Sequence, residues 1–161
     1  MQAAFGKVDV TPPVGGYHGR LKINRRPTEG VLWPLTARLA LFAEGASRLA
    51  ILIVDISIFT KPSSQELREA VAAGAGMSPD CVMVAATHTH NGSAAILWHP
   101  EEADLRYLDE LCAKAKALAA DCASRLTPAT LSGAMAEVPG FSLNRRPVYR
   151  AADGREQVGT H

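Results

Sequence analysis

Apolar residues recur along the chain with two different periods, and together they predict strands and helices in alternation. Residues 3–10 read as a short strand, and residues 36–42 (TARLALF) alternate in the way expected of a half-buried strand. Residues 49–58 (LAILIVDISI) are an almost unbroken apolar run, and residues 81–86 are a second one. Such runs are typical of sheet strands that are covered on both faces.

A helix is predicted between these two apolar runs. It begins within PSSQELREAVAAG, where Ser63 and Glu66 have the spacing of a capping box. Gly74 or Gly76 is expected to end it, because glycine adopts the left-handed conformation that terminates many helices. The order of strand, helix and strand favours a right-handed parallel unit.

The longest helical pattern covers residues 103–125. Thr127 and Pro128 follow it and are expected to end it. Residues 130–136 predict one more strand, and from Pro139 onward the chain reads as a loop. The apolar positions of the helix recur at helical spacing; they are Leu105, Leu108, Leu111, Cys112, Ala115, Leu118, Ala119, Cys122 and Leu126.

These elements predict an α/β fold with a mixed, partly parallel sheet covered by helices. Residues 17–33 form a long segment without a regular pattern, and a loop of that length is usually functional or disordered. The last residues, RAADGREQVGTH, contain no cap, closing strand or apolar anchor. The chain therefore reads as one that stops within a domain, and not at a natural terminus.

Composition restricts the binding partners and the cellular location that we expect. The chain has 161 residues, which suits one domain, and its 17 basic and 16 acidic residues leave a formal net charge of +1. This gives no electrostatic reason to expect nucleic acid or an anionic membrane as a partner. Three cysteines without CxxC spacing argue against disulfides or a zinc knuckle, and Cys112 and Cys122 are expected in the core. No signal peptide and no transmembrane segment are recognised, so a cytoplasmic location is expected.

The most distinctive stretch is VMVAATHTHNG, in which a strand leads into His88 and His90. Side chains alternate along a strand, so the two histidines are expected to point to the same side. They could then be two ligands of one metal, or one ligand beside an acid/base group. Gly92 is expected to let a substrate approach the backbone. The alternative is that both histidines are ordinary surface loop residues.

Further metal ligands would have to come from elsewhere, and His18 and His99 are the candidates within the chain. The cluster Asn144 to Arg146 could hold a carboxylate, a phosphate or a developing oxyanion, although such a run is more often a solvated basic loop. Asp55 is expected either to cap a loop or to orient a histidine. Asp9 is expected to form an Asx-type turn with Thr11.

Five segments in order resemble one family. They are FGKVDVTPPVGGYHGR (5–20), PLTARLALF (34–42), LAILIVDIS (49–57), VMVAATHTHNG (82–92) and LNRRP (143–147). They are similar to the N-terminal part of the neutral/alkaline non-lysosomal ceramidases, a family of zinc-dependent amidases that split the N-acyl bond of ceramide and are often secreted. The motif differs after THTH, where the family usually has Ser-Gly-Pro and this chain has Asn-Gly-Ser.

The resemblance implies a role for three residues. His88 would be a zinc ligand, His90 would lie beside the metal and assist the reaction, and Arg145 would contact the reacting group. In the family the remaining zinc ligands come from far downstream, and no residue of this chain, the terminal His161 included, is assigned to them. The resemblance therefore implies that residues 1–161 are the N-terminal portion of a larger catalytic domain. The substrate implied is a lipid or small-molecule amide.

Two other functions stay open at this point. One is a different metallohydrolase with an HxH motif, such as an amidohydrolase barrel. The other is a non-catalytic module that binds a ligand through the histidines and Arg145. Whether residues 1–161 alone are an enzyme is left open, because one or two histidines rarely hold catalytic zinc alone. Whether the chain forms a homo-oligomer is also left open.

Overall fold

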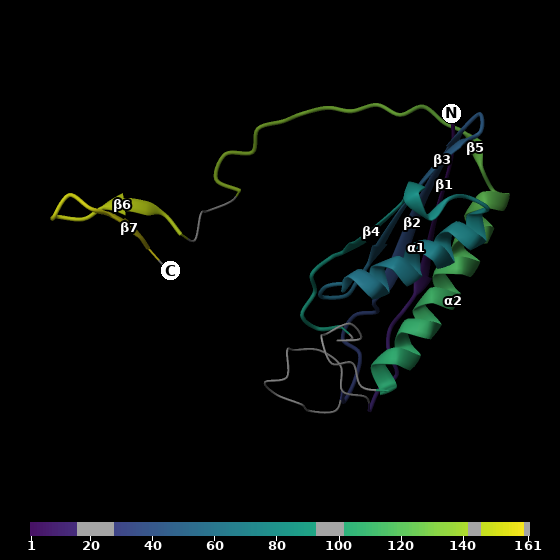
Figure 1. The fold of residues 1–161 in the computed structure, drawn as a ribbon, viewed down its shortest axis with the longest axis horizontal. Helices are drawn as coiled ribbons and strands as arrows, with labels where there is room; N and C mark the ends of the chain where they lie inside the picture. Colours follow the sequence, from purple (N-terminus) through teal and green to yellow (C-terminus); the bar gives the residue numbers. More distant parts are fainter. Residues whose placement is uncertain (16–27, 93–101, 142–145, 160–161) are drawn as a thin grey trace. The chain divides into compact units, whose positions relative to one another are not determined.

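The structure is a computed structural model that describes residues 1–15, 28–92, 102–141 and 146–159 (Figure 1). The chain divides into two compact units, Met1–Thr130 and Leu131–His161, which are described separately. The predicted loop at residues 17–33 lies partly outside the described residues, and its described end, residues 28–33, contains no helix or strand.

The first unit is built on a five-stranded mixed sheet with the strand order β4-β3-β2-β1-β5. Strands β1 (Gln2–Asp9), β2 (Thr36–Glu44) and β3 (Ser47–Val54) are antiparallel neighbours, joined between β2 and β3 by a tight turn. Strand β4 (Val82–Ala86) runs parallel to β3, and the short β5 (Thr127–Pro128) pairs with the start of β1. The predicted α/β fold with a mixed, partly parallel sheet is confirmed.

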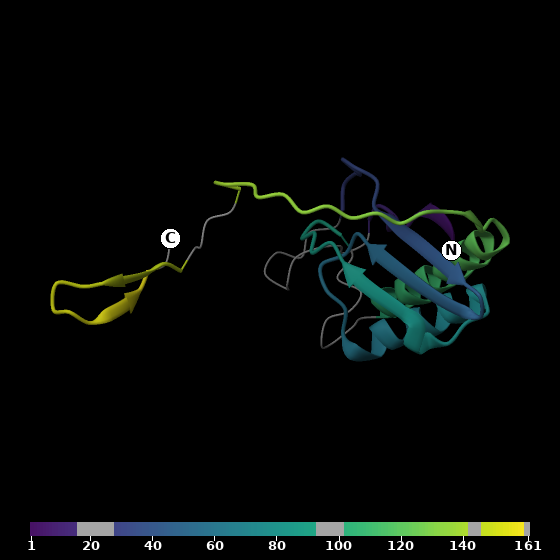
Figure 2. The same cartoon turned by 90° about the horizontal axis from the view of Figure 1, so that it is seen from above.

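Helices α1 (Lys61–Ala75) and α2 (Glu102–Ser124) pack against each other on one face of this sheet (Figure 2). Their apolar sides and the facing strand residues form one core, whose largest fully buried members are Val10, Leu39, Leu41, Leu52, Val54, Ile56, Leu67, Val71, Leu111 and Cys122. No helix in the described part of the chain is long and apolar enough to cross a membrane.

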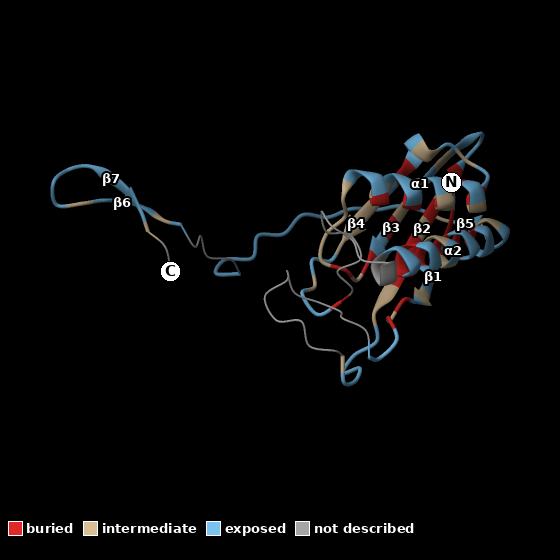
Figure 3. Ribbon diagram, turned by 60° about the horizontal axis from the view of Figure 1, so that its bottom comes forward, coloured by how far each residue is buried: buried red, intermediate tan, exposed pale blue. Residues whose placement is uncertain are grey.

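The opposite face of the sheet differs from the expectation drawn from residues 49–58. Burial alternates along β3, so that Leu52 and Val54 are buried whereas Leu49 and Ile53 are exposed (Figure 3). Within the described residues, the apolar run is therefore covered on one face only. The strand also ends at Val54, four residues earlier than the run itself, because the chain turns at Asp55.

The start of α1 is capped three residues before the predicted position. The Thr60 hydroxyl accepts from the Ser63 amide, and the Ser63 hydroxyl accepts in return from the Thr60 amide. This reciprocal box displaces the predicted Ser63–Glu66 pair. It leaves Pro62 in the first turn, where proline costs no hydrogen bond. Gly76 ends the helix with a left-handed φ of 63°, as one of the two predictions had it.

Gly74, the other predicted end, lies inside α1 where the two helices touch. A Cβ atom there would lie 2.2 Å from the carbonyl oxygen of Lys116 in α2. Glycine is therefore required at this position by the close approach of the helices, and not by the conformation of a helix terminus.

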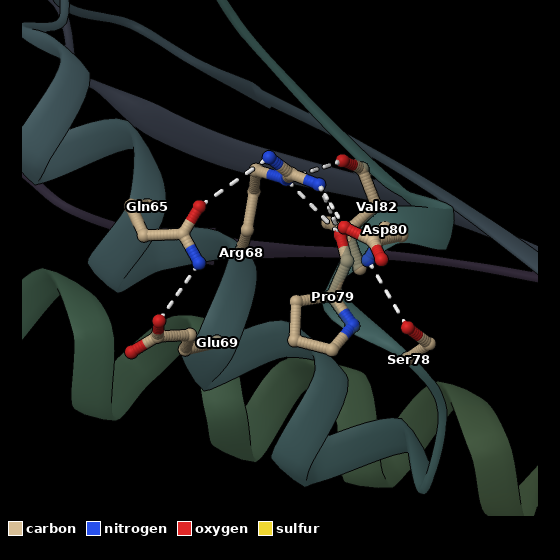
Figure 4. A network of polar contacts seen from close by, with 7 residues as sticks. All are labelled: Gln65, Arg68, Glu69, Ser78, Pro79, Asp80 and Val82. Carbon is tan, nitrogen blue, oxygen red and sulfur yellow. Dashed lines mark hydrogen bonds and ion pairs between the residues drawn. The ribbon is translucent and has the colours of Figure 1, made fainter.

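The turn that leads into β4 is held by Arg68 of α1 (Figure 4). Its guanidinium donates to the Pro79 carbonyl from Nε at 3.0 Å and from Nη2 at 2.7 Å. Nε also donates to the Val82 carbonyl at 3.1 Å, and Nη2 lies 3.3 Å from the Asp80 carboxylate. Arg68 thereby positions the start of the strand that ends at the two histidines.

Two predictions for the second unit are wrong. Residues 131–136 form no strand and lie exposed. In the segment expected to be a loop, β6 (Val148–Arg150) and β7 (Glu156–Val158) form an antiparallel hairpin. Its turn contains Asp153 followed by Gly154, which has a φ of 82°. An Asp-Gly pair is a strong hairpin signal.

Candidate metal centre

The two histidines lie in a segment of residues 87–92, here called the histidine loop, which follows β4. It packs against the turn of residues 55–57, here called the β3 turn. The amide of Thr87 donates to the Val54 carbonyl at 3.0 Å, which continues the contact between the parallel strands by one residue. Because β3 and β4 are parallel neighbours, both segments lie at the carboxyl edge of the sheet, where α/β folds place their ligand sites.

His88 is oriented by the β3 turn. Its Nδ1 lies 2.7 Å from the carbonyl oxygen of Ser57. Since a carbonyl only accepts, Nδ1 carries the proton in this hydrogen bond and Nε2 carries the lone pair. Metal-binding histidines are usually held in this way, with one ring nitrogen donating to a carbonyl or carboxylate while the other faces the metal. The ring is exposed, so Nε2 is accessible.

His90 brings a second nitrogen to the same place. Its Nε2 lies 3.4 Å from Nε2 of His88, and the two rings meet edge to face with centroids 4.9 Å apart. Two nitrogens bound to one tetrahedral zinc at about 2.0–2.1 Å would be separated by about 3.3 Å. The same distance suits a hydrogen bond from His90 to the lone pair of His88. The geometry therefore fits two ligands, and equally one ligand beside a proton donor.

The histidines meet for a different reason from the predicted one. Strand β4 ends at Ala86, before either histidine, so strand alternation does not align them. His88 instead has a φ of 64° and is the single non-glycine residue with positive φ among the described residues. This left-handed residue turns the chain, and the next two residues bring the second ring back toward the first.

Gly92 has a structural role in place of the predicted contact with substrate. It is buried, and a Cβ atom at this position would lie 3.1 Å from the carbonyl oxygen of Asp55 and 3.2 Å from Leu35. Protein atoms therefore occupy the space next to its backbone. The glycine lets the end of the histidine loop close onto the β3 turn.

Asp55 connects the end of β3 to β2. Its Oδ2 accepts from the amide of Thr36 at 2.8 Å and from the hydroxyl of the same residue at 2.9 Å, and Oδ1 lies 3.7 Å from Arg38. Burial alone would raise the pKa of Asp55, but these hydrogen bonds and the charge of Arg38 together hold it below its usual value.

At the neighbouring end of β1, the predicted Asx turn is confirmed. The amide of Thr11 donates to Oδ1 of Asp9 at 2.7 Å. The hydroxyl of Thr11 then accepts from the Leu35 amide at 2.9 Å, which closes β1 onto the start of β2. The Asp-x-Thr motif is therefore explained by local structure.

The cysteines are not site residues. All three are free, and Cys122 is buried in the core as predicted. Burial, together with the nearby Glu66 and Asp109, raises the pKa of the half-buried Cys112 to about 11, so this thiol stays protonated at neutral pH.

Several residues named from the sequence lie outside the described ones, namely the candidates His18, His99, Asn144 and Arg145, and also His161, to which no role is assigned. Within the described ranges, no group of three His, Cys, Asp or Glu side chains could hold a metal ion. The described part thus offers two nitrogen donors, fewer than the three protein ligands usual for catalytic zinc. The roles of His88, His90 and Arg145 stay predictions.

Comparison with known proteins gives a structural match. No protein-family model matches the sequence, and no match is found among curated proteins. The crystal structure of neutral ceramidase from Pseudomonas aeruginosa matches with a TM-score of 0.63 and 21% identity over 79% of this chain. A ceramidase complexed with C2 matches with a TM-score of 0.55, also at 21% identity and over 79% of this chain.

The match establishes the fold. The chain has the fold of a segment of neutral ceramidase and spans 22% of the length of each of these two chains. The resemblance expected from the sequence is thereby confirmed at the level of the fold.

Proposed function

We propose that the chain carries the first part of the active site of a zinc-dependent amide hydrolase of the neutral ceramidase type. Its substrate is N-acyl-sphingosine or a related lipid or small-molecule amide. The observation that carries the proposal is the pair of Nε2 atoms 3.4 Å apart, one of them freed for a metal by the bond from Nδ1 of His88 to Ser57. Its location at the carboxyl edge of a sheet with the ceramidase fold supports the same function.

Each residue has a defined task in this proposal. His88 binds zinc through Nε2, and zinc, when bound, polarises the amide carbonyl and lowers the pKa of a water molecule. His90, one hydrogen-bond length away, takes up or delivers a proton beside the metal. Arg145 contacts the oxyanion that develops on the carbonyl. The remaining ligands come from outside the described residues.

Zinc content by mass spectrometry of the purified chain tests the proposal. We expect zinc to bind to the wild-type chain and to be lost in His88→Ala. His90→Ala is the matched control, because it removes the neighbouring ring of the same loop. It is expected to keep zinc, because the proposal gives His90 a task in proton transfer and none in binding the metal. Wild-type protein without zinc, or full retention of zinc in His88→Ala, would contradict the proposal.

A non-catalytic ligand-binding module is the second candidate function. It is favoured by the lack of three suitable metal ligands within the described residues. It predicts substoichiometric zinc and no amide hydrolysis by this chain, with ligand binding that still depends on His88. The alternative of an amidohydrolase barrel fits poorly, because that barrel is built from parallel strands whereas β1, β2 and β3 are antiparallel.

A further inference from the structure

Gly92 is the single buried residue of the histidine loop, whose other members are exposed or half-buried. A Cβ atom at this position would lie 3.1 Å from the carbonyl oxygen of Asp55 and 3.2 Å from Cδ1 of Leu35. It would also lie 3.4 Å from Cγ2 of Thr89, within the loop itself. The end of the loop is therefore packed tightly against three neighbours, in a space that has no room for a side chain.

The main chain that Gly92 contacts is held on both sides. The amide of Asp55 donates to the Thr36 carbonyl at 2.9 Å, and the amide of Ile56 donates to the Val54 carbonyl at 2.9 Å. The side chain of Ile56 is fully buried in the core. The Asp55 carbonyl is thus a fixed obstacle, and a side chain added at position 92 would move the loop before it moved the β3 turn.

The histidine loop is held at two points with a short segment between them. His88 is held by the hydrogen bond from its Nδ1 to the Ser57 carbonyl at 2.7 Å. Gly92 is held by its packing against Asp55. Three residues lie between these points, and His90 is the middle one. Its ring is therefore located by the two ends of the segment.

The segment between the two points has a fold of its own. The amide of Asn91 donates to Oγ1 of Thr89 at 3.3 Å, in the manner of a turn closed by a threonine hydroxyl. The Cγ2 atom of the same threonine faces Gly92. Because the segment is short and internally bonded, a displacement at Gly92 has to move His90.

We propose that Gly92 is the positioning residue for His90. Its lack of a side chain lets the loop close onto the Asp55 carbonyl, and this closure brings Nε2 of His90 to 3.4 Å from Nε2 of His88. The significance for catalysis rests on the function proposed above, in which His90 handles a proton beside the metal. Gly92 acts through His90 and has no contact of its own with the reacting atoms.

Substitutions at Gly92 are expected to act through space and not through backbone strain. Its φ lies outside the left-handed region, so other residues can adopt its conformation. Gly92→Ala requires the surroundings to give by a few tenths of an ångström. Gly92→Val adds two further methyl groups to the same space and requires a larger displacement. The two variants therefore form a graded series.

The test uses the whole 161-residue chain without metal and two NMR measurements. The nuclear Overhauser effect between the ring protons of His88 and His90 reports whether the two rings are in contact. Long-range ¹H–¹⁵N spectra report the tautomer of His88. In the wild type we expect the ring–ring effect, together with the proton of His88 on Nδ1.

The two readouts are expected to separate in the variants. Gly92→Val should lose the ring–ring effect, and Gly92→Ala should weaken it. Both should keep the proton of His88 on Nδ1, because Ser57 holds that ring independently of the loop end. Zinc affinity, measured by calorimetry with zinc chloride, should then escape the about 10- to 100-fold loss that follows when the support of a ligand is removed.

Gly30→Val is the matched control. It makes the same chemical change at a described glycine that also lies outside the left-handed region, but no atom lies within 4 Å of the position of its Cβ. This variant is expected to keep both the ring–ring effect and the tautomer of the wild type.

The positioning role is overturned if folded Gly92→Val keeps the full ring–ring effect. It is also overturned if Gly92→Val loses the His88 tautomer together with the ring–ring effect, because Gly92 would then support the loop as a whole and not His90. If Gly92→Val does not fold, Gly92→Ala decides by the same two readouts.

Failure of the proposed function has a separate signature. In that case the wild type binds no zinc, while the contact between the two rings still responds to substitution of Gly92. That result supports the positioning role and removes the metal from the account of the site.

Discussion

Both faces of the sheet carry apolar side chains, and they differ in how far the described residues cover them. On the helix-covered face, Ala37, Leu39 and Leu41 of β2 are buried together with Ala50, Leu52 and Val54 of β3. On the opposite face, here called the open face, Phe5 is 64% exposed and Met83 is 52% exposed. The same strands supply both faces, since successive side chains point to opposite sides of a strand. Hydrophobicity along a strand therefore does not reveal how many of its faces are covered.

The open face changes in character along its strands. Its central row consists of Phe5, Ala40, Ile51 and Met83, which are neighbours across the four main strands and are all apolar. In the next row toward the carboxyl edge of β3, Lys7 and Arg38 lie beside Ile53 and Ala85, and Asp55 lies beyond this row. The covered face thus holds the fold together, whereas charged side chains join the apolar ones on the open face of β1 and β2.

The largest expected effect is a difference in stability between variants of two adjacent residues of β3. Leu52 is fully buried under the helices, and Ile53 lies on the open face with 38% of its surface exposed. We expect Leu52→Ala to lower the free energy of unfolding by about 2–5 kcal/mol, because it leaves a cavity in the core. We expect Ile53→Ala to lower it by less than about 1 kcal/mol. Urea unfolding with comparison of m-values measures both.

The variants Leu52→Ala and Ile53→Ala also test whether the open face is exposed in solution. Equal losses in the two variants would mean that the open face is covered in solution, for example by a second copy of the chain. Dependence of the Ile53→Ala loss on protein concentration would identify that case.

The second expected effect concerns the polar end of the open face. Because the pKa of Asp55 in the folded chain lies below its ordinary value of 3.8, the charged carboxylate stabilises the fold at pH values above about 4. That contribution fades as the pH falls through the lowered pKa. The difference in unfolding free energy between wild type and Asp55→Asn should therefore be constant from about pH 5 to 7 and shrink below about pH 4.

Urea unfolding at several pH values measures this difference. A difference that stays constant to pH 3, or that grows as the pH falls, would show that the hydrogen bonds from Thr36 do not favour the charged form of Asp55.

The spacing of apolar residues predicted those helices and strands whose buried positions follow from the local sequence. Residues 103–125 were assigned correctly, because their apolar spacing matches one face of a helix. The run at 81–86 was assigned correctly as a strand, but its burial was not, since only Val82 of β4 is buried. The capping box was displaced because the helix begins one turn earlier, where Thr60 and Ser63 satisfy each other's amides. The hairpin of β6 and β7 was missed although Asp153-Gly154 signals it.

The candidate site was predicted in part. The HxH spacing correctly predicted that the two histidines lie close together. The predicted cause was strand alternation, whereas the observed cause is the left-handed conformation of His88. The support from Ser57 could not be predicted, because it comes from a main-chain carbonyl that carries no mark in the sequence.

The smallest expected effect on stability belongs to Met83, on the open face of β4. Met83→Thr should change the free energy of unfolding by no more than about 0.5 kcal/mol, because the side chain is already half exposed and threonine suits a strand. The same change should reduce binding of an apolar dye such as ANS, because it interrupts the row from Phe5 to Met83. Dye fluorescence at equal protein concentration measures this. Unchanged dye binding together with a large loss of stability would place Met83 in a packed interior and would contradict the contrast between the two faces.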